Sequence, residues 1–344
     1  MNNNDRLNDW KNLRRQQKSL RTSEYLLPLL KSGDKTALSA AITLTESSLA
    51  QDKLESKKLL QAILPHTGRS KRIGITGVPG VGKSSFIEVF GKHLIDAGYK
   101  LAVLAIDPSS NVTGGSILGD KTRMNWLSQQ SNVFIRPQAA SDQLGGVAKS
   151  TKECMLLCEA AGYDFVIIET VGVGQSETSV HDMVDFFLLL MLSGAGDELQ
   201  GMKRGIMEMA DAIVITKADG NNIQQAKRAR TQYANALHLF PAKKSDWIPK
   251  ALTCSSLENH GLHEVLEMIE SYFLQITTNG WIEILRKNQE KKVFEKHINE
   301  LFQNFIVSND NLKELKKMLS EQVSLGELSG YQAAEFFFES IRKI

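Results

Sequence analysis

The sequence has few cysteines and no excess charge of either sign. The three cysteines are Cys154, Cys158 and Cys254, and the first two stand four residues apart, which is not a C-x-x-C motif. An odd number provides no even disulfide framework, so we expect buried, reduced thiols. Lysine and arginine together number 41 against 39 aspartates and glutamates. No global positive field therefore indicates a nucleic-acid or membrane partner, and any anion site must be local.

Long hydrophobic runs are also missing. The most apolar stretch, residues 186–192, is about a third of the ~20 residues that a helix needs to span a bilayer. The first residues, Met1 to Asp9, are polar and contain no signal-peptide core. We find no repeat and no low-complexity tract, and 42% hydrophobic with 23% charged residues is typical of a globular protein. These features predict a cytoplasmic protein.

Hydrophobic runs and helix-length segments alternate through the middle of the chain. Such alternation predicts an α/β fold, in which helices cover both faces of a parallel sheet. The expected strands are residues 73–76, 101–106, 133–135, 165–168, 186–192, 212–215 and 251–254. The order predicts an N-terminal helical segment over residues 1–65, an α/β domain over 66–275 and a C-terminal helical region over 276–344.

The C-terminal helical region has an apolar stripe at helical spacing. Its members are Phe294, Ile298, Leu301, Phe302 and Phe305. This stripe indicates either a homodimer interface or packing within the same chain.

The strongest motif lies between the first expected strand and a helix. Residues 77–84 fit G-x-x-x-x-G-K-[ST], the phosphate-binding loop of P-loop proteins. Glycines let the backbone turn its N–H groups toward a phosphate chain, and the following helix N-terminus adds partial positive charge. Lys83 is expected to reach the β- and γ-phosphates, and the Ser84 hydroxyl to ligate Mg²⁺. The predicted phosphate-binding residues are Gly77, Val78, Pro79, Gly80, Val81, Gly82, Lys83, Ser84 and Ser85.

Carboxylates follow two of the expected strands. Glu169 ends the run at 165–168 and is expected to hold Mg²⁺, through water because a glutamate reaches one methylene further than the usual aspartate. Gly172 then lets its N–H approach the γ-phosphate, so we predict Lys83, Glu169 and Gly172 as the catalytic residues. Asp107 and Asp120 flank a second glycine-rich loop and are further candidates for the metal site, although a solvated loop would have the same composition.

A base-recognition element follows the strand at 212–215. Thr216, Lys217 and Asp219 resemble the N-K-x-D element of GTPases, in which the aspartate accepts from two guanine N–H groups and the lysine stem lies on the base. The same residues could instead start a helix, with Asp219 as its cap. Thr216 stands where Asn is usual, and its shorter side chain is expected to lose the amide that braces the phosphate loop. After the last strand, Ser255, Ser256 and Leu257 resemble the serine-led base-edge loop of GTPases.

Several strings together resemble the methylmalonyl-CoA mutase-associated GTPases, also called the ArgK-like or MeaB-type family. They include residues 77–85, 107–110, 114–124 (GGSILGDKTRM), 169–177 (ETVGVGQSE), 194–205 (GAGDELQGMKRG) and 216–219. The resemblance implies a dimeric GTPase that chaperones an adenosylcobalamin-dependent acyl-CoA mutase and gates its cofactor loading. It implies Mg²⁺ as cofactor, with GTP as substrate and GDP as product. Residues 194–205 would relay nucleotide state to the mutase, with Lys203 and Arg204 in their basic stretch.

Two other functions stay open. An older association of the family is with a kinase for amino-acid transport binding proteins. Metallochaperone GTPases of related fold are the second alternative, but seven scattered histidines and three cysteines supply no metal cluster. The chain has no D-x-H-x-x-G string, so cobalamin is expected to bind the partner rather than this chain.

Overall fold

The computed structural model describes residues 21–107, 124–139, 144–170, 176–194 and 204–342. Contacts divide the chain into two compact units, residues 1–283 and 284–344. The first unit contains a seven-stranded sheet, and the second contains only helices among its described residues. The three-part domain division drawn from the sequence stays a prediction.

All seven expected strands are present and parallel. They are β1 (Lys71–Gly77), β2 (Leu101–Asp107), β3 (Val133–Ala139), β4 (Phe165–Glu169), β5 (Phe186–Met191), β6 (Ala212–Ile215) and β7 (Lys250–Thr253). The sheet order is β3-β2-β4-β1-β5-β6-β7, so the chain places β2, β3 and β4 on one side of β1 and then crosses to the other. Ligands in such sheets bind beyond the carboxyl ends of the strands at this switch. The predicted α/β class is confirmed.

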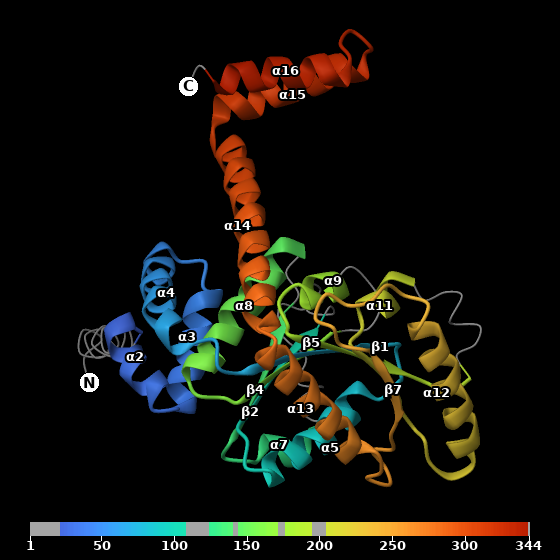
Figure 1. Cartoon of the computed structure of the whole chain (residues 1–344). Coiled ribbons are helices and arrows are strands. Elements are labelled where there is room, and N and C mark those ends of the chain that lie inside the picture. The colour runs from blue at the N-terminus through green and yellow to red at the C-terminus, as the bar shows by residue number, and fades with distance from the viewer. Residues whose placement is uncertain (1–20, 108–123, 140–143, 171–175, 195–203, 343–344) are drawn as a thin grey trace, which may run out of the picture. The chain divides into compact units, whose positions relative to one another are not determined.

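Helices cover both faces of the sheet, as Figure 1 shows. Alternate strand residues separate two apolar layers: Ile73 and Ile75 pack with helices α5 (Lys83–Asp96) and α13 (Leu262–Thr278). Ala102 and Leu104 face the opposite layer, with helix α8 (Leu144–Ala160). Because the strands are buried on both faces, they consist of almost continuous hydrophobic runs. The other helical elements of the sheet region are α7 (Asn125–Ser128), α9 (Ser176–His181), α11 (Arg204–Met209), the 3-10 turn η3 (Gly220–Asn222) and α12 (Ile223–Leu237).

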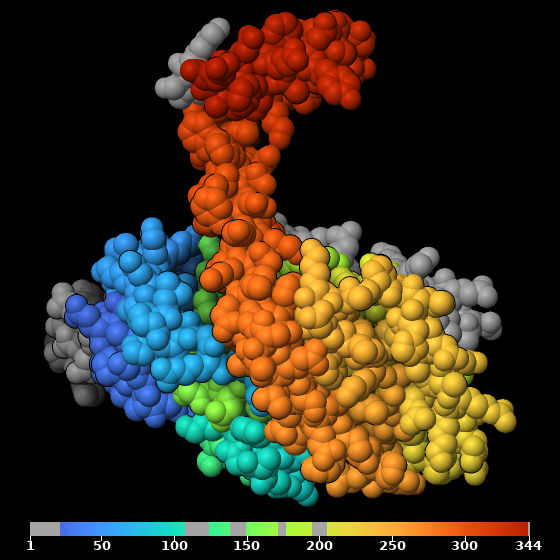
Figure 2. All heavy atoms as spheres, viewed as in Figure 1, coloured from blue at the N-terminus to red at the C-terminus, as the bar shows by residue number. Residues whose placement is uncertain are grey.

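The expected N-terminal helical segment packs on the sheet. Its helices are α2 (Ser23–Lys31), α3 (Lys35–Glu46) and α4 (Ala50–Ile63), followed by the 3-10 turn η1 (Leu64–His66). Leu26, Leu38 and Leu59 are fully buried in the same apolar layer as α8. In the space-filling view these helices are the blue surface at the left (Figure 2). The segment therefore belongs to the first compact unit.

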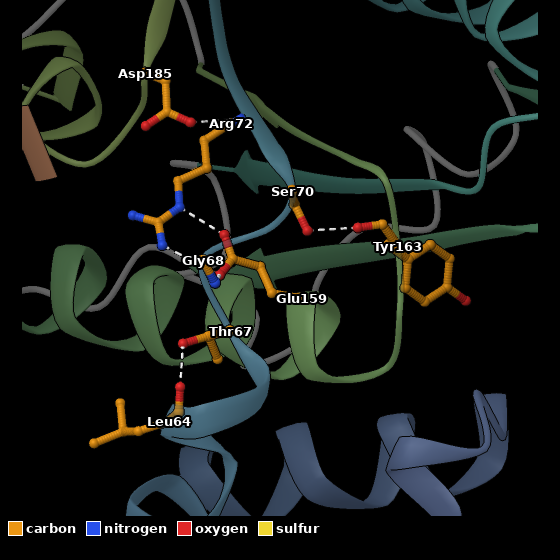
Figure 3. A network of polar contacts seen from close by, with 8 residues as sticks. All are labelled: Leu64, Thr67, Gly68, Ser70, Arg72, Glu159, Tyr163 and Asp185. Atoms are coloured by element: carbon orange, nitrogen blue, oxygen red, sulfur yellow. Dashed lines mark hydrogen bonds and ion pairs between the residues drawn. The ribbon is translucent and has the colours of Figure 1, made fainter. Parts of the chain in front are cut away.

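A buried ion pair fixes the start of β1, the strand that leads into the phosphate loop. The Arg72 guanidinium donates to both carboxylate oxygens of Glu159, at 2.6 and 3.1 Å (Figure 3). The N–H of Gly68 donates to the same carboxylate at 2.7 Å, and the Arg72 N–H donates to Asp185 at 3.0 Å. These bonds join β1 to the end of α8 and the start of β5. Charged groups buried this deeply are found paired and hydrogen-bonded because an isolated charge would be strongly disfavoured.

The second unit is built from α14 (Trp281–Ser308), whose first residues belong to the first unit, α15 (Asp310–Ser324) and α16 (Gly330–Ile341). Leu312 and Leu319 on α15 and Ala333 on α16 are buried. By contrast, Phe294 and Phe302 on α14 are 65% and 61% exposed. The apolar stripe of α14 is therefore not covered within the described chain.

In the described part of the chain, no helix is long and apolar enough to span a bilayer. Cys154, Cys158 and Cys254 are buried and free, as expected from the sequence. Burial raises the pKa of the Cys254 thiol to about 12, and the nearby charge of Asp219 acts in the same direction.

Candidate functional site

The phosphate loop joins β1 to α5 at the carboxyl edge of the sheet. Its Gly82 has φ of 90°, a left-handed conformation that favours glycine, and it precedes Lys83, the first residue of α5. Gly77 is required for another reason: a Cβ there would lie 2.5 Å from the main-chain oxygen of Leu190. The predicted strand, loop and helix are thus present in the order that a phosphate site needs.

Side-chain donors hold three carbonyl groups of this loop. Lys83 Nζ donates to the Gly77 oxygen at 3.0 Å, and Lys217 Nζ to the Gly80 oxygen at 2.8 Å. The hydroxyl of Thr216 donates to the Val81 oxygen at 2.7 Å. Carbonyl oxygens carry partial negative charge and repel phosphate. Hydrogen bonds from these side chains engage the three carbonyl groups and reduce that repulsion, which suits a loop that binds an anion.

The contact of Thr216 corrects the expectation that threonine would lose the brace. The residue directly follows β6, and its N–H donates to the Met191 oxygen at 2.8 Å, which holds the side chain beside the loop. A buried hydroxyl reaches the Val81 carbonyl directly. The Val81 carbonyl needs a hydrogen-bond donor at this point, and the threonine hydroxyl supplies one.

The predicted metal residues Ser84 and Glu169 meet directly. Ser84 Oγ donates to Glu169 Oε1 at 3.1 Å, and both side chains are buried. Next to them, the Thr170 N–H donates to the Ile75 oxygen, and its hydroxyl donates to Thr76 Oγ1 at 2.8 Å. These two bonds join the end of β4 to the residues before the phosphate loop. Sequence reasoning missed the roles of Thr76 and Thr170, because neither the strand at 73–76 nor the string at 169–177 shows that these two residues, 94 positions apart, are partners.

Asp107 is the last residue of β2, at the same edge of the sheet as Glu169. Other predicted residues cannot be placed in this site. The structure does not describe Asp120, Gly172 and Lys203, nor the side chains of Asp107 and Arg204. Among the residues that the structure describes, no three His, Cys, Asp or Glu side chains form a group that could hold a metal ion.

The predicted base-recognition residues come together from two strand ends. Ser255, two residues after β7, is fully buried and its hydroxyl donates to Asp219 Oδ2 at 2.5 Å. The N–H of Glu258 donates to Ser255 Oγ at 3.0 Å, and Ser255 and His260 exchange two main-chain bonds. Ser256 is half-buried, whereas Leu257 is 86% exposed.

A contact that the sequence does not indicate supports this loop from the side. Nε2 of His93, near the end of α5, lies 2.7 Å from Oδ1 of Asn259. The helix that starts at the phosphate loop is therefore bonded to the base-edge loop. His93 and Asn259 belong to no motif, and 166 positions separate them.

The fold and this site define a P-loop nucleotide hydrolase. The profile of the family described as "Methylmalonyl Co-A mutase-associated GTPase MeaB" matches residues 38–311. GTPase ArgK of Escherichia coli (strain K12) is 45% identical over 317 residues, which cover 90% of this chain and 96% of that protein. The mitochondrial methylmalonic aciduria type A homolog of Mus musculus is 40% identical over 335 residues, covering 94% and 81%. A crystal structure named LAO/AO transport system kinase superposes with a TM-score of 0.76 at 37% identity, covering 93% and 97%.

The chain belongs to the MeaB family of methylmalonyl-CoA mutase-associated GTPases. The family resemblance predicted from the sequence is confirmed, and so is the activity class, a GTP hydrolase with a P-loop fold.

Proposed function

We propose that this GTPase is a chaperone of an adenosylcobalamin-dependent acyl-CoA mutase, which it helps to load with cofactor and to protect or reactivate. Membership of a family described as mutase-associated carries this proposal. We further propose that it acts in the cytoplasm, without nucleic-acid or membrane partners, and that cobalamin binds the mutase rather than this chain.

Mg²⁺ suits the oxygen donors present at the phosphate site. Ser84 and Glu169 offer a hydroxyl and a carboxylate 3.1 Å apart, and hard oxygen ligands are those that Mg²⁺ prefers. We therefore propose that Ser84 holds the ion directly and that Glu169 holds it directly or through water, with Asp107 and Asp120 as further ligands. When bound, the ion would neutralise charge on the β- and γ-phosphate oxygens.

Hydrolysis then depends on positioning and on charge. Water attacks the γ-phosphorus in line, the bond to the bridging oxygen breaks, and GDP and phosphate leave. Lys83 provides a positive charge at the phosphate loop, and we propose that the Gly172 N–H contacts the γ-phosphate. Phosphoryl transfer without a supplied arginine is slow, so we expect a low basal rate that the partner raises.

Guanine is the base that we propose for this site. Asp219 accepts from Ser255 through Oδ2, which orients its carboxylate, and guanine presents an N–H pair to such a group whereas adenine does not. Asp219→Asn is expected to weaken GDP binding by about 1–3 kcal/mol, because amide N–H groups would face the base N–H groups. Calorimetric titration with GDP and ADP measures this preference, and equal affinities of the parent for the two would argue against guanine.

The partner is tested by adding a purified adenosylcobalamin-dependent acyl-CoA mutase to the GTPase. We expect the mutase to raise GTP turnover, and Lys203→Ala to remove this stimulation while leaving the basal rate within about twofold, because Lys203 is not one of the predicted phosphate-binding residues and charged residues at an interface change partner contacts more than chemistry. Phosphate release reports both rates. If the basal rate of Lys203→Ala is as low as that of a phosphate-site variant, residues 194–205 take part in catalysis. If stimulation by the mutase survives unchanged in Lys203→Ala, the proposal that these residues relay nucleotide state to the mutase is rejected.

The kinase association is the second candidate, favoured by the similarity to the crystal structure named LAO/AO transport system kinase. A kinase would transfer the γ-phosphoryl group to a protein side chain, whereas the proposed function transfers it to water. Incubation with γ-labelled GTP and candidate transport binding proteins separates the two outcomes, since only a kinase would label protein. The metallochaperone alternative has no observation in its favour.

We also propose a homodimer that uses the second unit. Phe294 and Phe302 expose most of their surface, and exposed apolar stripes of this kind mark protein interfaces. Light scattering at micromolar concentration is expected to give about twice the 38.2 kDa of one chain, since an apolar interface of this kind stabilises obligate dimers. Phe302→Glu is expected to lower that mass, and a 38.2 kDa species for the parent would reject the dimer.

A further inference from the structure

The side chain of Asn222 connects two strand ends at the rim of the sheet. Its Nδ2 donates to the main-chain oxygen of Lys217 at 2.6 Å, and its Oδ1 accepts from the hydroxyl of Ser193 at 2.5 Å. Ser193 lies two residues after β5, and Lys217 two residues after β6. Asn222 is half-buried at the last position of η3, where its own N–H donates to the Asp219 oxygen at 2.9 Å.

The hydrogen-bonding capacity of its two partners fixes the orientation of the Asn222 side-chain amide. The Lys217 carbonyl can only accept a hydrogen bond, so the NH₂ group must face it. The carbonyl oxygen of the amide then faces Ser193, whose hydroxyl can donate. Turning the amide over would place two acceptors against each other at Lys217. Asn222 therefore makes a specific bond to the residue that contacts the phosphate loop.

Lys217 needs such support because its backbone is unusual. Its φ is 55°, a left-handed conformation that side chains other than glycine, asparagine and aspartate seldom adopt. Conformations of this kind persist where surrounding bonds determine them, and they concentrate at functional sites. With the backbone in this state, the Lys217 side chain reaches the Gly80 oxygen at 2.8 Å, while the Asp219 carboxylate meets Ser255.

We propose that Asn222 is a positioning residue for the nucleotide: by holding the main chain of Lys217 with its side chain, it sets guanine-nucleotide affinity without contacting the nucleotide. This inference rests on the proposed guanine site. A positioning role of this kind predicts a change in binding rather than in the chemical step, because the Asn222 side chain bonds to Ser193 and Lys217 and not to the Ser84–Glu169 pair.

The test compares the parent chain with Asn222→Ala, Asn222→Asp and the matched control Asn221→Ala, whose side chain is exposed at the adjacent position. Asn222→Asp has nearly the same shape but replaces the donor by a carboxylate oxygen that faces the Lys217 carbonyl. Fluorescent mant-GDP gives the dissociation constant and rate, GTP turnover gives kcat and KM, and thermal unfolding gives Tm.

Loss of one net hydrogen bond predicts that Asn222→Ala and Asn222→Asp each raise the dissociation constant for mant-GDP by about tenfold. We expect KM to rise with it, and kcat at saturating GTP, Tm and every property of Asn221→Ala to stay near the parent. A matching affinity in Asn222→Ala and the parent overturns the proposal, as does a fall in kcat or Tm without a change in affinity.

Failure of the guanine site gives a different result. If the parent itself binds GDP no better than ADP, the proposed function loses its base preference, whatever Asn222 does. If the parent prefers GDP and Asn222→Ala binds it equally well, only the role of Asn222 is rejected.

Discussion

Lys83→Ala is expected to abolish GTP hydrolysis, with a fall of about 10³-fold in kcat/KM, because it removes a charge that stabilises the phosphates in the transition state. Lys83 begins α5, and its Nζ lies 3.0 Å from the Gly77 oxygen, directly over the phosphate loop. An alanine cannot place any positive charge there. Phosphate release under single-turnover conditions measures the loss of chemistry, and mant-GTP titration measures the accompanying loss of affinity.

Lys92→Ala is the matched control for this experiment. Lys92 lies on the same helix, is exposed, and places its ammonium 5.6 Å from the ring centroid of Trp126. The variant Lys92→Ala therefore removes a positive charge from α5 without changing the phosphate loop, and its GTP turnover is expected to stay near that of the parent. Near-normal hydrolysis by Lys83→Ala would reject the phosphate site.

The second large effect is on stability. Glu159→Ala is expected to lower the free energy of unfolding by about 3–5 kcal/mol, because it leaves the buried Arg72 guanidinium without its carboxylate. The two side chains are 5% and 0% exposed, so water cannot replace the lost partner. Chemical denaturation followed by circular dichroism gives the difference between variant and parent.

Two further variants separate this effect from a general loss of charge. Lys58→Ala removes one side of the Glu55–Lys58 pair, in which Lys58 is 57% exposed, and is expected to change stability little. The double variant Arg72→Met with Glu159→Leu fills similar space without charge and is expected to recover part of the loss, because the Gly68 N–H still loses the Glu159 carboxylate as its acceptor. If Glu159→Ala unfolds at the same denaturant concentration as the parent, the ion pair does not stabilise β1.

The sheet could be predicted from the sequence because its strands are buried on both faces. Each expected strand is an almost continuous apolar run, and all seven are found. The largest error in length is at β3, expected to end at Ile135 but continuing to Ala139 through Arg136 and Pro137. β3 is an edge strand that pairs only with β2. Polar residues and proline are tolerated at an edge, so the apolar pattern ended before the strand did.

Residues of the site could be predicted where a local motif contains them, even when the motifs are far apart: Ser84 and Glu169, 85 positions apart, meet as expected. The phosphate loop is a local motif, and its strand and helix were readable on either side. The brace from Thr216 to Val81 spans 135 positions, and the bond from Thr170 to Thr76 spans 94. Such contacts depend on which strand ends are neighbours in the sheet, which no periodicity along the chain specifies. Asn222 was missed for another reason: it is only five positions from Lys217, but it belongs to no motif.

The bond from Thr216 to the Val81 carbonyl also limits how this position can diverge among descendants of the gene. The acceptor is main chain, so the bond itself does not require a particular side chain at residue 81. At position 216, serine would preserve a hydroxyl donor, whereas valine, of nearly the same shape as threonine, would leave a buried carbonyl without its donor. Substitution at position 216 is thus restricted by the need for a short side chain with a hydrogen-bond donor, rather than by side-chain size alone. A search pattern that demands asparagine at this position would overlook proteins in which a hydroxyl bonds to the phosphate loop.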